Sequence, residues 1–340
     1  MEGKGLRVLA RSWAAPAGDR GMLPSVRCRE EVYRAYWHLA CERQRIFHGR
    51  ARGEPGPWTA DPILGEYKFT NAYRASDRVS QFLIGDVIYG SHELPAEDVL
   101  CRIVLFRLFS RVETWQALEA QLGPITAATL GDPRLDAALE ALRGEGPIYT
   151  SAFILCAHDA FGLGRKHRNH VALVRSMLQT GLGGQVARAR GLADVYAALV
   201  EFPLIGPFMA YQLATDINYS ELTDFSEDDF TVAGPGAERG IRKVFPDATR
   251  RQMTAIIMRM VEEQHSAPER LELSFDDLFG RPLHAIDCQN LFCELDKYSR
   301  VAFPHLKSNR QRIKTRFAAS PNRLGLRYPP KWALRGVPPG

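Results

Sequence analysis

The sequence predicts an all-α fold with two helical lobes and a cleft between them. Apolar residues recur at helical spacing along most of the 340 residues, and in residues 29–48 they place Val32, Tyr36 and Leu39 on one face. The alternating pattern of a half-buried strand is scarce, with one weak instance at residues 149–155. Apolar residues make up 45% of the chain, which is typical of a globular protein with a substantial core.

Start and stop signals place the individual helices. Thr70 is expected to cap a helix that runs to Tyr89, and Pro95 to open one that ends at Ser110, because proline suits a first helical turn. Helical spacing predicts the others in chain order at residues 29–48, 113–122, 133–143, 167–180, 192–202, 208–218, 237–245, 248–264 and 287–298. We expect an N-terminal arm at 1–28, a helical domain at 29–300 and a basic tail at 301–340.

Several classes of protein are excluded by what the sequence lacks. No apolar run approaches the length of a membrane span, and the N-terminus has no continuous apolar core of a secretion signal. The six cysteines are scattered without a CxxC pair, so we expect reduced cysteines in a cytoplasmic protein. The motifs GxxxxGK[ST], GxGxxG and HExxH are absent, and neither a nucleotide nor a metal cofactor is expected.

The last part of the chain is strongly basic. No acidic residue follows Asp296, whereas eleven lysines and arginines do, with aromatic residues interleaved. Such a segment neutralises phosphates while its aromatics pack or stack, which indicates a polyanion partner. We expect Arg300, Lys307 and Arg310 to contact DNA phosphates. The alternative is a solubilising tail.

Residues 201–240 carry the most informative pattern. Two predicted helices are joined by an apolar turn at residues 203–207, where the amides of Ile205 and Gly206 could hold a phosphate. An acidic cluster follows about twenty residues after Gly206, formed by Asp224, Glu227, Asp228 and Asp229. A phosphate-binding turn followed by a carboxylate is typical of DNA glycosylases. The alternative is a helical hairpin followed by a solvated acidic loop.

A second turn follows this acidic cluster. Gly234 and Gly236 flank Pro235 just before a predicted helix, whose free amides would attract an anion. A carboxylate beside such a turn suits hydrolysis of an N-glycosidic bond, because it stabilises the cation-like C1′ or directs water at it. The alternative is that the acids only cap the next element.

Two further segments are candidates for a pocket that binds a modified base. One, at residues 67–81, is dense in polar groups and would place several on one side of a helix: Asn71, Tyr73, Arg74 and Asp77. The other, at 287–300, offers Asn290, Glu294 and Lys297. The alternatives are an internal salt-bridge network and a solvated charged face. A basic cluster at residues 165–170 is a further candidate for phosphate contact.

Five of these motifs together resemble one known family. They are KFTNAYRASDRVSQ, FRLFSRVETW, IGPFMAYQLATDINY, DDFTVAGPGAERG and NLFCELDKYSR, in that order between residues 68 and 300. The family is the 5-hydroxymethyl-deoxyuridine DNA kinase helical domain, also called α-glutamyl/putrescinyl-thymine pyrophosphorylase. It handles hypermodified pyrimidines in phage DNA and is related to helix-hairpin-helix DNA glycosylases, which implies a fold of that kind.

The resemblance also assigns roles by position. Leu204 replaces the first glycine of the glycosylase hairpin, and Phe208 stands where bifunctional glycosylases have a lysine. Without that amine no Schiff base forms, so simple hydrolysis is implied. The essential aspartate would fall near Ser226, which makes Asp224, Asp228 and Asp229 the candidates, with Asp228 or Asp229 preferred.

We therefore expect a monomeric DNA glycosylase that flips a hypermodified pyrimidine out of double-stranded DNA and leaves an abasic site. A glucosylated hydroxymethylpyrimidine and a role in defence against phages are implied by the resemblance. The second expectation is a kinase or transferase that acts on the hydroxymethyl group of a pyrimidine in DNA, which needs a nucleotide donor. A third is a DNA-binding module without catalysis.

Overall fold

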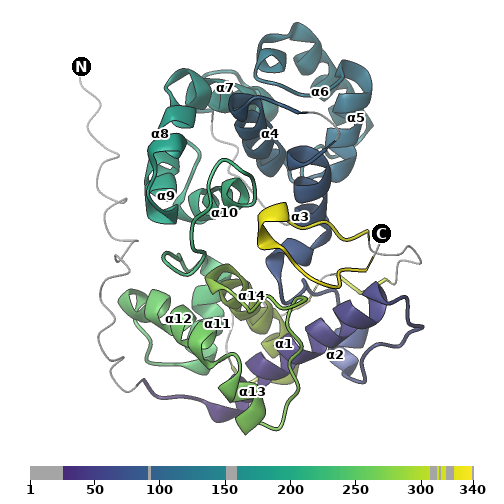
Figure 1. Cartoon of the computed structure of the whole chain (residues 1–340), viewed down its shortest axis with the longest axis vertical. Coiled ribbons are helices and arrows are strands. Elements are labelled where there is room, and N and C mark those ends of the chain that lie inside the picture. The colour runs from purple at the N-terminus through teal and green to yellow at the C-terminus, as the bar shows by residue number, and fades with distance from the viewer. Residues whose placement is uncertain are drawn as a thin grey trace. The chain divides into compact units, whose positions relative to one another are not determined.

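The computed structural model describes residues 26–90, 93–150, 159–306, 312–313, 315–318 and 325–338. These residues form helices joined by turns, with two isolated bridges and no longer strand, so the all-α prediction is confirmed (Figure 1). The chain divides into two compact units. Unit 1 comprises Met1–Asp77 and Glu227–Gly340, and unit 2 is Arg78–Ser226.

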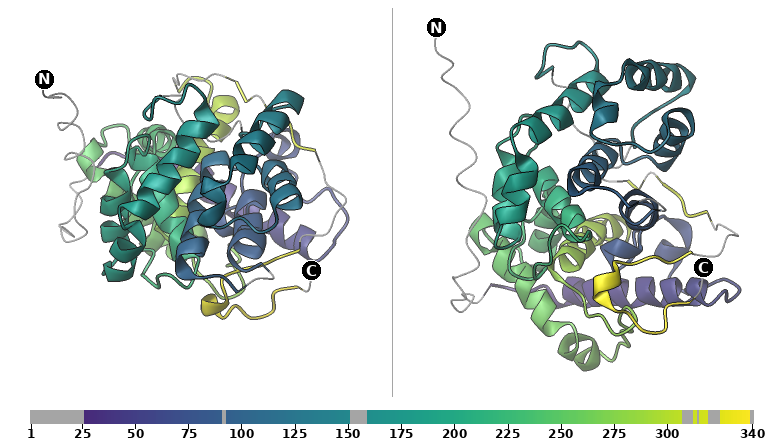
Figure 2. Two further views of the ribbon diagram at one scale, coloured as in Figure 1. Left: turned by 90° about the horizontal axis from the view of Figure 1, so that it is seen from above. Right: turned by 45° about the horizontal axis from the view of Figure 1, so that its top comes forward.

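Unit 1 is built around helices from both ends of the chain. Its longest helix, α1, appears as one continuous helix in the right view of Figure 2. Its helices and 3-10 turns are α1 (Glu30–Ala51), α2 (Pro62–Glu66), η2 (Arg74–Ser76), α11 (Pro235–Val244), η5 (Arg250–Gln252), α12 (Met253–Glu263), α13 (Ser266–Arg270), α14 (Ala285–Ala302) and η6 (Pro330–Trp332). α14 packs against α1, α11 and α12 and is therefore the central element of this unit.

Unit 2 is continuous in sequence. It contains α3 (Arg78–Phe82), the π-helical turn η3 (Leu83–Ile88), α4 (Ala96–Phe109), α5 (Val112–Leu122), η4 (Ala128–Gly131), α6 (Pro133–Glu145), α7 (Lys166–Gln179), α8 (Leu182–Arg188), α9 (Leu192–Val200) and α10 (Pro207–Asn218). α4 is buried on all sides from Leu100 to Phe109 and contacts α7, α8 and α10. α9 and α10 pack against each other, as expected for the two helices of the predicted hairpin.

The predicted helix from Thr70 to Tyr89 is wrong over its first half. Residues 70–73 are extended or turn, η2 is a single 3-10 turn, and helix begins only at Arg78. The backbone departs from a helix because side chains take over its hydrogen bonds. Asn71 N donates to Asp77 Oδ1 (2.8 Å), and the Asn71 side chain donates to the Ser76 carbonyl (2.7 Å).

Other predicted helices begin and end within a few residues of those observed, except that residues 248–264 form η5 and α12 instead of one helix. The short helices α2, α8 and α13 were not expected. Most of the weak strand at 149–155, most of the arm at 1–28, and Lys307 and Arg310 lie outside the described residues. The described residues 325–338 pack Leu326, Tyr328, Trp332 and Leu334 onto the core of unit 1.

Close packing of α11 on α14 depends on Gly240. A Cβ atom built there would lie 2.0 Å from the Phe292 carbonyl oxygen, which belongs to the helix backbone and cannot turn aside. Gly240→Ala is expected to lower the free energy of unfolding by about 1–3 kcal/mol, because the two helices must separate. Urea denaturation measures this, and Gly144→Ala, where nothing lies within 4 Å, is the control. Equal stability of the two variants would contradict it.

Candidate active site

Asp228 lies in unit 1 on the turn that leads to α11, and its carboxylate is held by the start of α14. His284 Nδ1 donates to Asp228 Oδ2 (2.7 Å), and Ala285 N donates to Asp228 Oδ1 (2.8 Å). Ala285 is the first residue of α14, so the carboxylate sits at the positive end of that helix. The Asp228 side chain is 30% exposed, which leaves it accessible to a ligand.

His284 supports the negative charge on Asp228. Burial alone would lower the pKa of His284, but the hydrogen bond and the charge of Asp228 outweigh burial, and the pKa is raised. The His284 imidazole and the Ala285 amide both donate to this carboxylate. A carboxylate fixed in this way can stabilise positive charge on a substrate. The sequence reasoning missed His284, although a polar residue just before a predicted helix signals a possible cap.

A second carboxylate lies beneath this pair. Asp287, in the first turn of α14, accepts from His284 N (3.1 Å) and from Arg74 N (2.7 Å). Burial, and then the charge of Glu227, raise the pKa of Asp287 to about 6. The contacts join the turn at Arg74 to His284 and so to Asp228. Sequence reasoning did not single out Asp287, since its partner Arg74 is 213 residues away in the chain.

The neighbouring acid, Glu227, is buried and forms an ion pair with Arg281 (Oε1 to NH2, 2.6 Å). The Arg281 guanidinium also stacks on Trp332, 3.6 Å from the centroid of the ring. The backbone carbonyl of Arg281 accepts from the Tyr73 hydroxyl (2.8 Å). Tyr73 is buried, so its predicted contact with a substrate would need this hydrogen bond to open. These contacts fix the turn that carries Asp228.

The residues predicted on segment 67–81 gather in the same unit, in a folded loop and not on one helix face. Arg43, nearly buried on α1, donates to the Thr70 carbonyl (2.8 Å) and to Asn71 Oδ1 (2.9 Å). The acceptor and the donor of the Asn71 amide are thus both used within unit 1. This agrees with the internal polar network that was the alternative, and base reading by Asn71 stays a prediction.

α14 brings its own predicted residues to this loop. Glu294 Oε2 accepts from Thr70 N (2.9 Å) and from Lys297 Nζ (2.6 Å), while Lys297 lies over the Phe69 ring. Asn290 accepts from the Gln289 side chain, whose oxygen in turn accepts from Gly234 N (3.3 Å). Glu294 and Lys297 therefore support the loop at Thr70, and their contact with a base stays a prediction.

The turn at Gly234 and Gly236 faces α14. A Cβ atom at Gly236 would come within 2.9 Å of Cys293 Sγ, so the glycine allows helix packing at this point. Since the Gly234 amide already donates to Gln289, phosphate binding by this turn stays a prediction. Arg300, also predicted to contact phosphate, lies on the last turns of α14 and pairs with Asp296 (2.8 Å).

The remaining predicted residues fall elsewhere. Asp229 is exposed one residue after Asp228, and Asp224 is exposed in unit 2. Ile205 and Gly206 are also in unit 2, at the turn between α9 and α10. Leu204 has a φ of 68°, the left-handed conformation that glycine favours, at the position where the resembling hairpin has a glycine. The expected approach of this turn to the acidic cluster stays a prediction.

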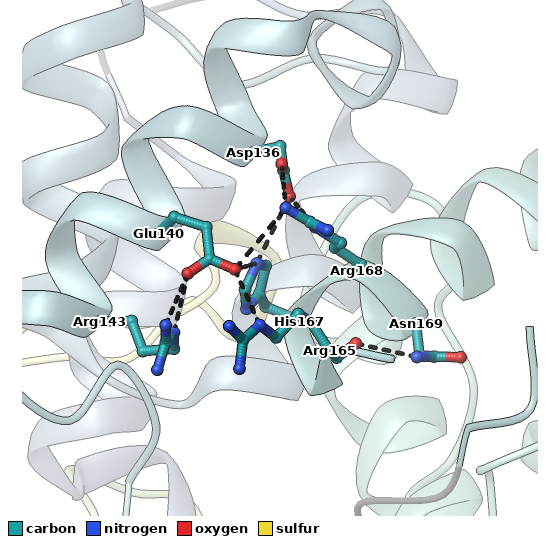
Figure 3. A network of polar contacts seen from close by, with 7 residues as sticks. All are labelled: Asp136, Glu140, Arg143, Arg165, His167, Arg168 and Asn169. Carbon is teal, nitrogen blue, oxygen red and sulfur yellow. Dashed lines mark hydrogen bonds and ion pairs between the residues drawn. The ribbon is translucent and has the colours of Figure 1, made fainter. Parts of the chain in front are cut away.

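Unit 2 also contains the basic cluster that was predicted at residues 165–170. Figure 3 shows Asp136 and Glu140 of α6 facing Arg165, His167 and Arg168 at the start of α7, with Arg168 in a two-bond contact to Asp136 (2.8 and 2.9 Å). Much of its positive charge is therefore neutralised internally. A cavity of about 240 Å³ lies beside this cluster, lined by Leu135, Arg168, Val171 and Arg175 among others. No residue from the acidic turn at Asp228 lines it.

Among the residues that the structure describes, no group of three or more His, Cys, Asp or Glu is arranged to hold a metal ion. None of the helices they form is long and apolar enough to cross a membrane.

The partly buried carboxyl group of Asp77 should make the stability of the fold depend on pH. Burial, with a contribution from Glu294, raises its pKa from 3.8 to about 7. A raised carboxyl pKa stabilises the fold most below about pH 4, and this contribution is lost as pH rises through about 7. Between pH 4.5 and 7.5, this group should lower the free energy of unfolding of the unaltered protein by on the order of 2 kcal/mol. Asp77→Asn should abolish that decrease. Urea midpoints at the two pH values, with exposed Asp247→Asn as control, measure it. An unchanged fall would contradict it.

Comparison with known proteins identifies the family that the chain resembles. The family model described as "5-hmdU DNA kinase, helical domain" matches residues 30–308. A curated relative, the 5-hmdU DNA kinase of Bacillus phage SP10, is 28% identical over 291 residues. That match covers 79% of this chain but 45% of the relative, so the chain spans about half the relative's length. No solved structure matches the chain.

Proposed function

Because the chain belongs to the 5-hmdU DNA kinase helical-domain family, we propose that it acts on a pyrimidine in DNA that carries a hydroxymethyl group or a substituent built on one. The family and the phage relative supply the substrate class. The basic residues after Asp296 supply the charge that DNA binding requires.

For the reaction we propose hydrolysis of the N-glycosidic bond, and the observation that carries it is the Asp228 carboxylate. His284 Nδ1 and Ala285 N donate to it and hold it in place, and 30% of its side chain is open to solvent. As the base leaves, C1′ gains positive charge, which a fixed carboxylate stabilises or quenches by directing water. Phe208 stands where a Schiff-base lysine would be, so the product is an abasic site with an intact strand.

The second candidate is a kinase or transferase that modifies the hydroxymethyl group. The phage relative is a 5-hmdU DNA kinase, which supports this candidate more directly than it supports hydrolysis. Against it, the 340 residues contain no GxxxxGK[ST] loop for the phosphates of a nucleotide donor.

One assay separates the two reactions. The protein is incubated with duplexes that contain 5-hydroxymethyluracil, 5-hydroxymethylcytosine, or glucosylated hydroxymethylcytosine in either anomer, with and without γ-labelled ATP. Alkali-labile abasic sites that form without ATP support hydrolysis. Transfer of label to the DNA supports the kinase. If neither product forms on any duplex, both reactions are refuted.

For defence against phages, we expect cells that express the protein to show fewer plaques from phages whose DNA carries the substrate base. Phages with unmodified DNA should form plaques as before.

A further inference from the structure

A second charged centre lies in unit 1, where the last turns of α11 and α14 meet. The Asp296 carboxylate, which is fully buried, pairs with three cations. Arg239 Nε is 3.1 Å from Oδ2, Lys243 Nζ is 3.2 Å from Oδ1, and Arg300 NH2 is 2.8 Å from Oδ2. Arg239 and Lys243 are one helical turn apart on α11, as Asp296 and Arg300 are on α14.

These charges do not balance. Three cations share one carboxylate, which leaves an excess of two positive charges at a site where two of the cations are almost buried. The side chains of Lys243 and Arg300 are 6% and 9% exposed. Burial, together with the like charges of Arg300 and Arg239, lowers the pKa of Lys243. Such an excess is costly in a poorly solvated site, and an added anion would relieve it.

Donors remain for that anion. Arg239 uses only Nε in its contact with Asp296, and its side chain is 31% exposed, so its terminal amino groups can donate to a second partner. Arg300 Nε is buried and has no hydrogen-bond partner among the described residues. The cluster is therefore open to solvent through Arg239, with the charges of Lys243 and Arg300 behind it.

The surrounding surface continues the same charge. Glu238, one residue before Arg239, pairs with both Arg242 (3.2 Å) and Arg250 (3.4 Å). Arg29 donates to the carbonyls of Arg242 and Lys243 at the end of α11. We define the α11 basic face as four cations with partly or fully exposed side chains, Arg29, Arg239, Arg242 and Arg250, together with the nearly buried Lys243 and Arg300 behind Arg239. Two carboxylates, Glu238 and Asp296, oppose them.

We propose that the α11 basic face binds the phosphate backbone of DNA, with Arg239 as its anchoring contact. A row of cations with too few carboxylates neutralises successive phosphates, and guanidinium groups donate to phosphate oxygens in pairs. Contact of this kind positions the duplex without reading its sequence. The inference rests on the proposed function only in taking DNA as the ligand.

The test is the salt dependence of binding to an unmodified duplex, which needs no base chemistry. Affinities of the full chain and of Arg239→Gln are measured by fluorescence anisotropy across a series of NaCl concentrations. Loss of one phosphate contact should reduce the slope of log affinity against log salt by about 0.9. Arg52→Gln is the matched control, because Arg52 follows the far end of α1, about 33 Å along that helix from Arg29.

The outcomes separate cleanly. A lower slope for Arg239→Gln, with an unchanged slope for Arg52→Gln, supports the α11 basic face. Equal slopes for both variants overturn it, as does a full chain that does not bind the duplex. Thermal unfolding in phosphate and in chloride at equal ionic strength adds a second arm. If phosphate stabilises the protein, Arg239→Gln abolishes that stabilisation, and the slope of log DNA affinity against log salt is unchanged, the cluster binds free phosphate. That result overturns the proposal. A full chain that releases no base but shows the slope change leaves this inference standing.

Discussion

Replacing Asp228 with Asn should lower the rate of base release by about 10²–10³-fold while DNA binding persists. Asn keeps the size of the side chain and one oxygen to accept from Ala285 N. It lacks the negative charge that His284 and the start of α14 are arranged to support. In the proposed hydrolysis, the lost interaction would act on the developing charge at C1′ and not on the bound substrate. Single-turnover release of the modified base, with the protein in excess, measures the chemical step directly.

The neighbouring acid gives the control. Asp229→Asn makes the same chemical change one residue later, at an exposed position, and should leave the rate unchanged. If Asp229→Asn or Asp224→Asn lost the activity instead, the carboxylate would be assigned there. If Asp228→Asn released base at the rate of the unmodified protein, hydrolysis through Asp228 would be refuted. His284→Gln is expected to have a smaller effect, and as a positioning change it should alter the pH profile of the rate.

Helical spacing predicted the fold class and most helices because it depends on a local property, namely which face of each helix carries apolar residues and packs on the core. It failed at residues 70–77 because non-local contacts act there beside the local hydrogen bonds of Asn71 with Asp77 and Ser76. Arg43 and Glu294 bind the Thr70 carbonyl and amide from 27 residues before and 224 residues after it. These contacts replace the helical hydrogen bonds that the local pattern favours, and the chain turns back on itself.

The same reason limited the prediction of the candidate site. Asp228 was among the candidates because it lies in a dense acidic cluster, which is visible in the sequence. Its partner His284 is 56 residues away and was not recognised, since no local pattern marks which residue a carboxylate will meet. The Arg239–Asp296 contact, across 57 residues, was invisible for the same reason, although Arg300 had been named from the excess of basic residues. Motif order predicted the family, and the match over residues 30–308 confirms it.

Unit 2 makes the second prediction with a large effect, at the buried ion pair between Arg107 and Asp216. Arg107 NH2 is 2.9 Å from Asp216 Oδ1, Nε also donates to Oδ2, and both side chains are at most 2% exposed. The pair joins α4 to the end of α10. Asp216→Asn should lower the free energy of unfolding by about 3–5 kcal/mol, because it leaves a buried guanidinium without its counter-charge. Chemical denaturation monitored by circular dichroism measures this loss.

A double substitution distinguishes lost charge balance from lost packing. Arg107→Met combined with Asp216→Leu removes both charges while keeping similar apolar volume, so it should be less destabilising than Asp216→Asn alone. If the double variant lost as much stability as Arg107→Met and Asp216→Leu lose together, Arg107 and Asp216 would be acting independently and the argument would fail.

α10 begins at the Ile205–Gly206 turn. If that turn holds a phosphate, Asp216→Asn should also bind unmodified DNA less tightly. Asp228→Asn leaves α10 untouched and should keep that affinity, which separates a loss of scaffold from a loss of chemistry.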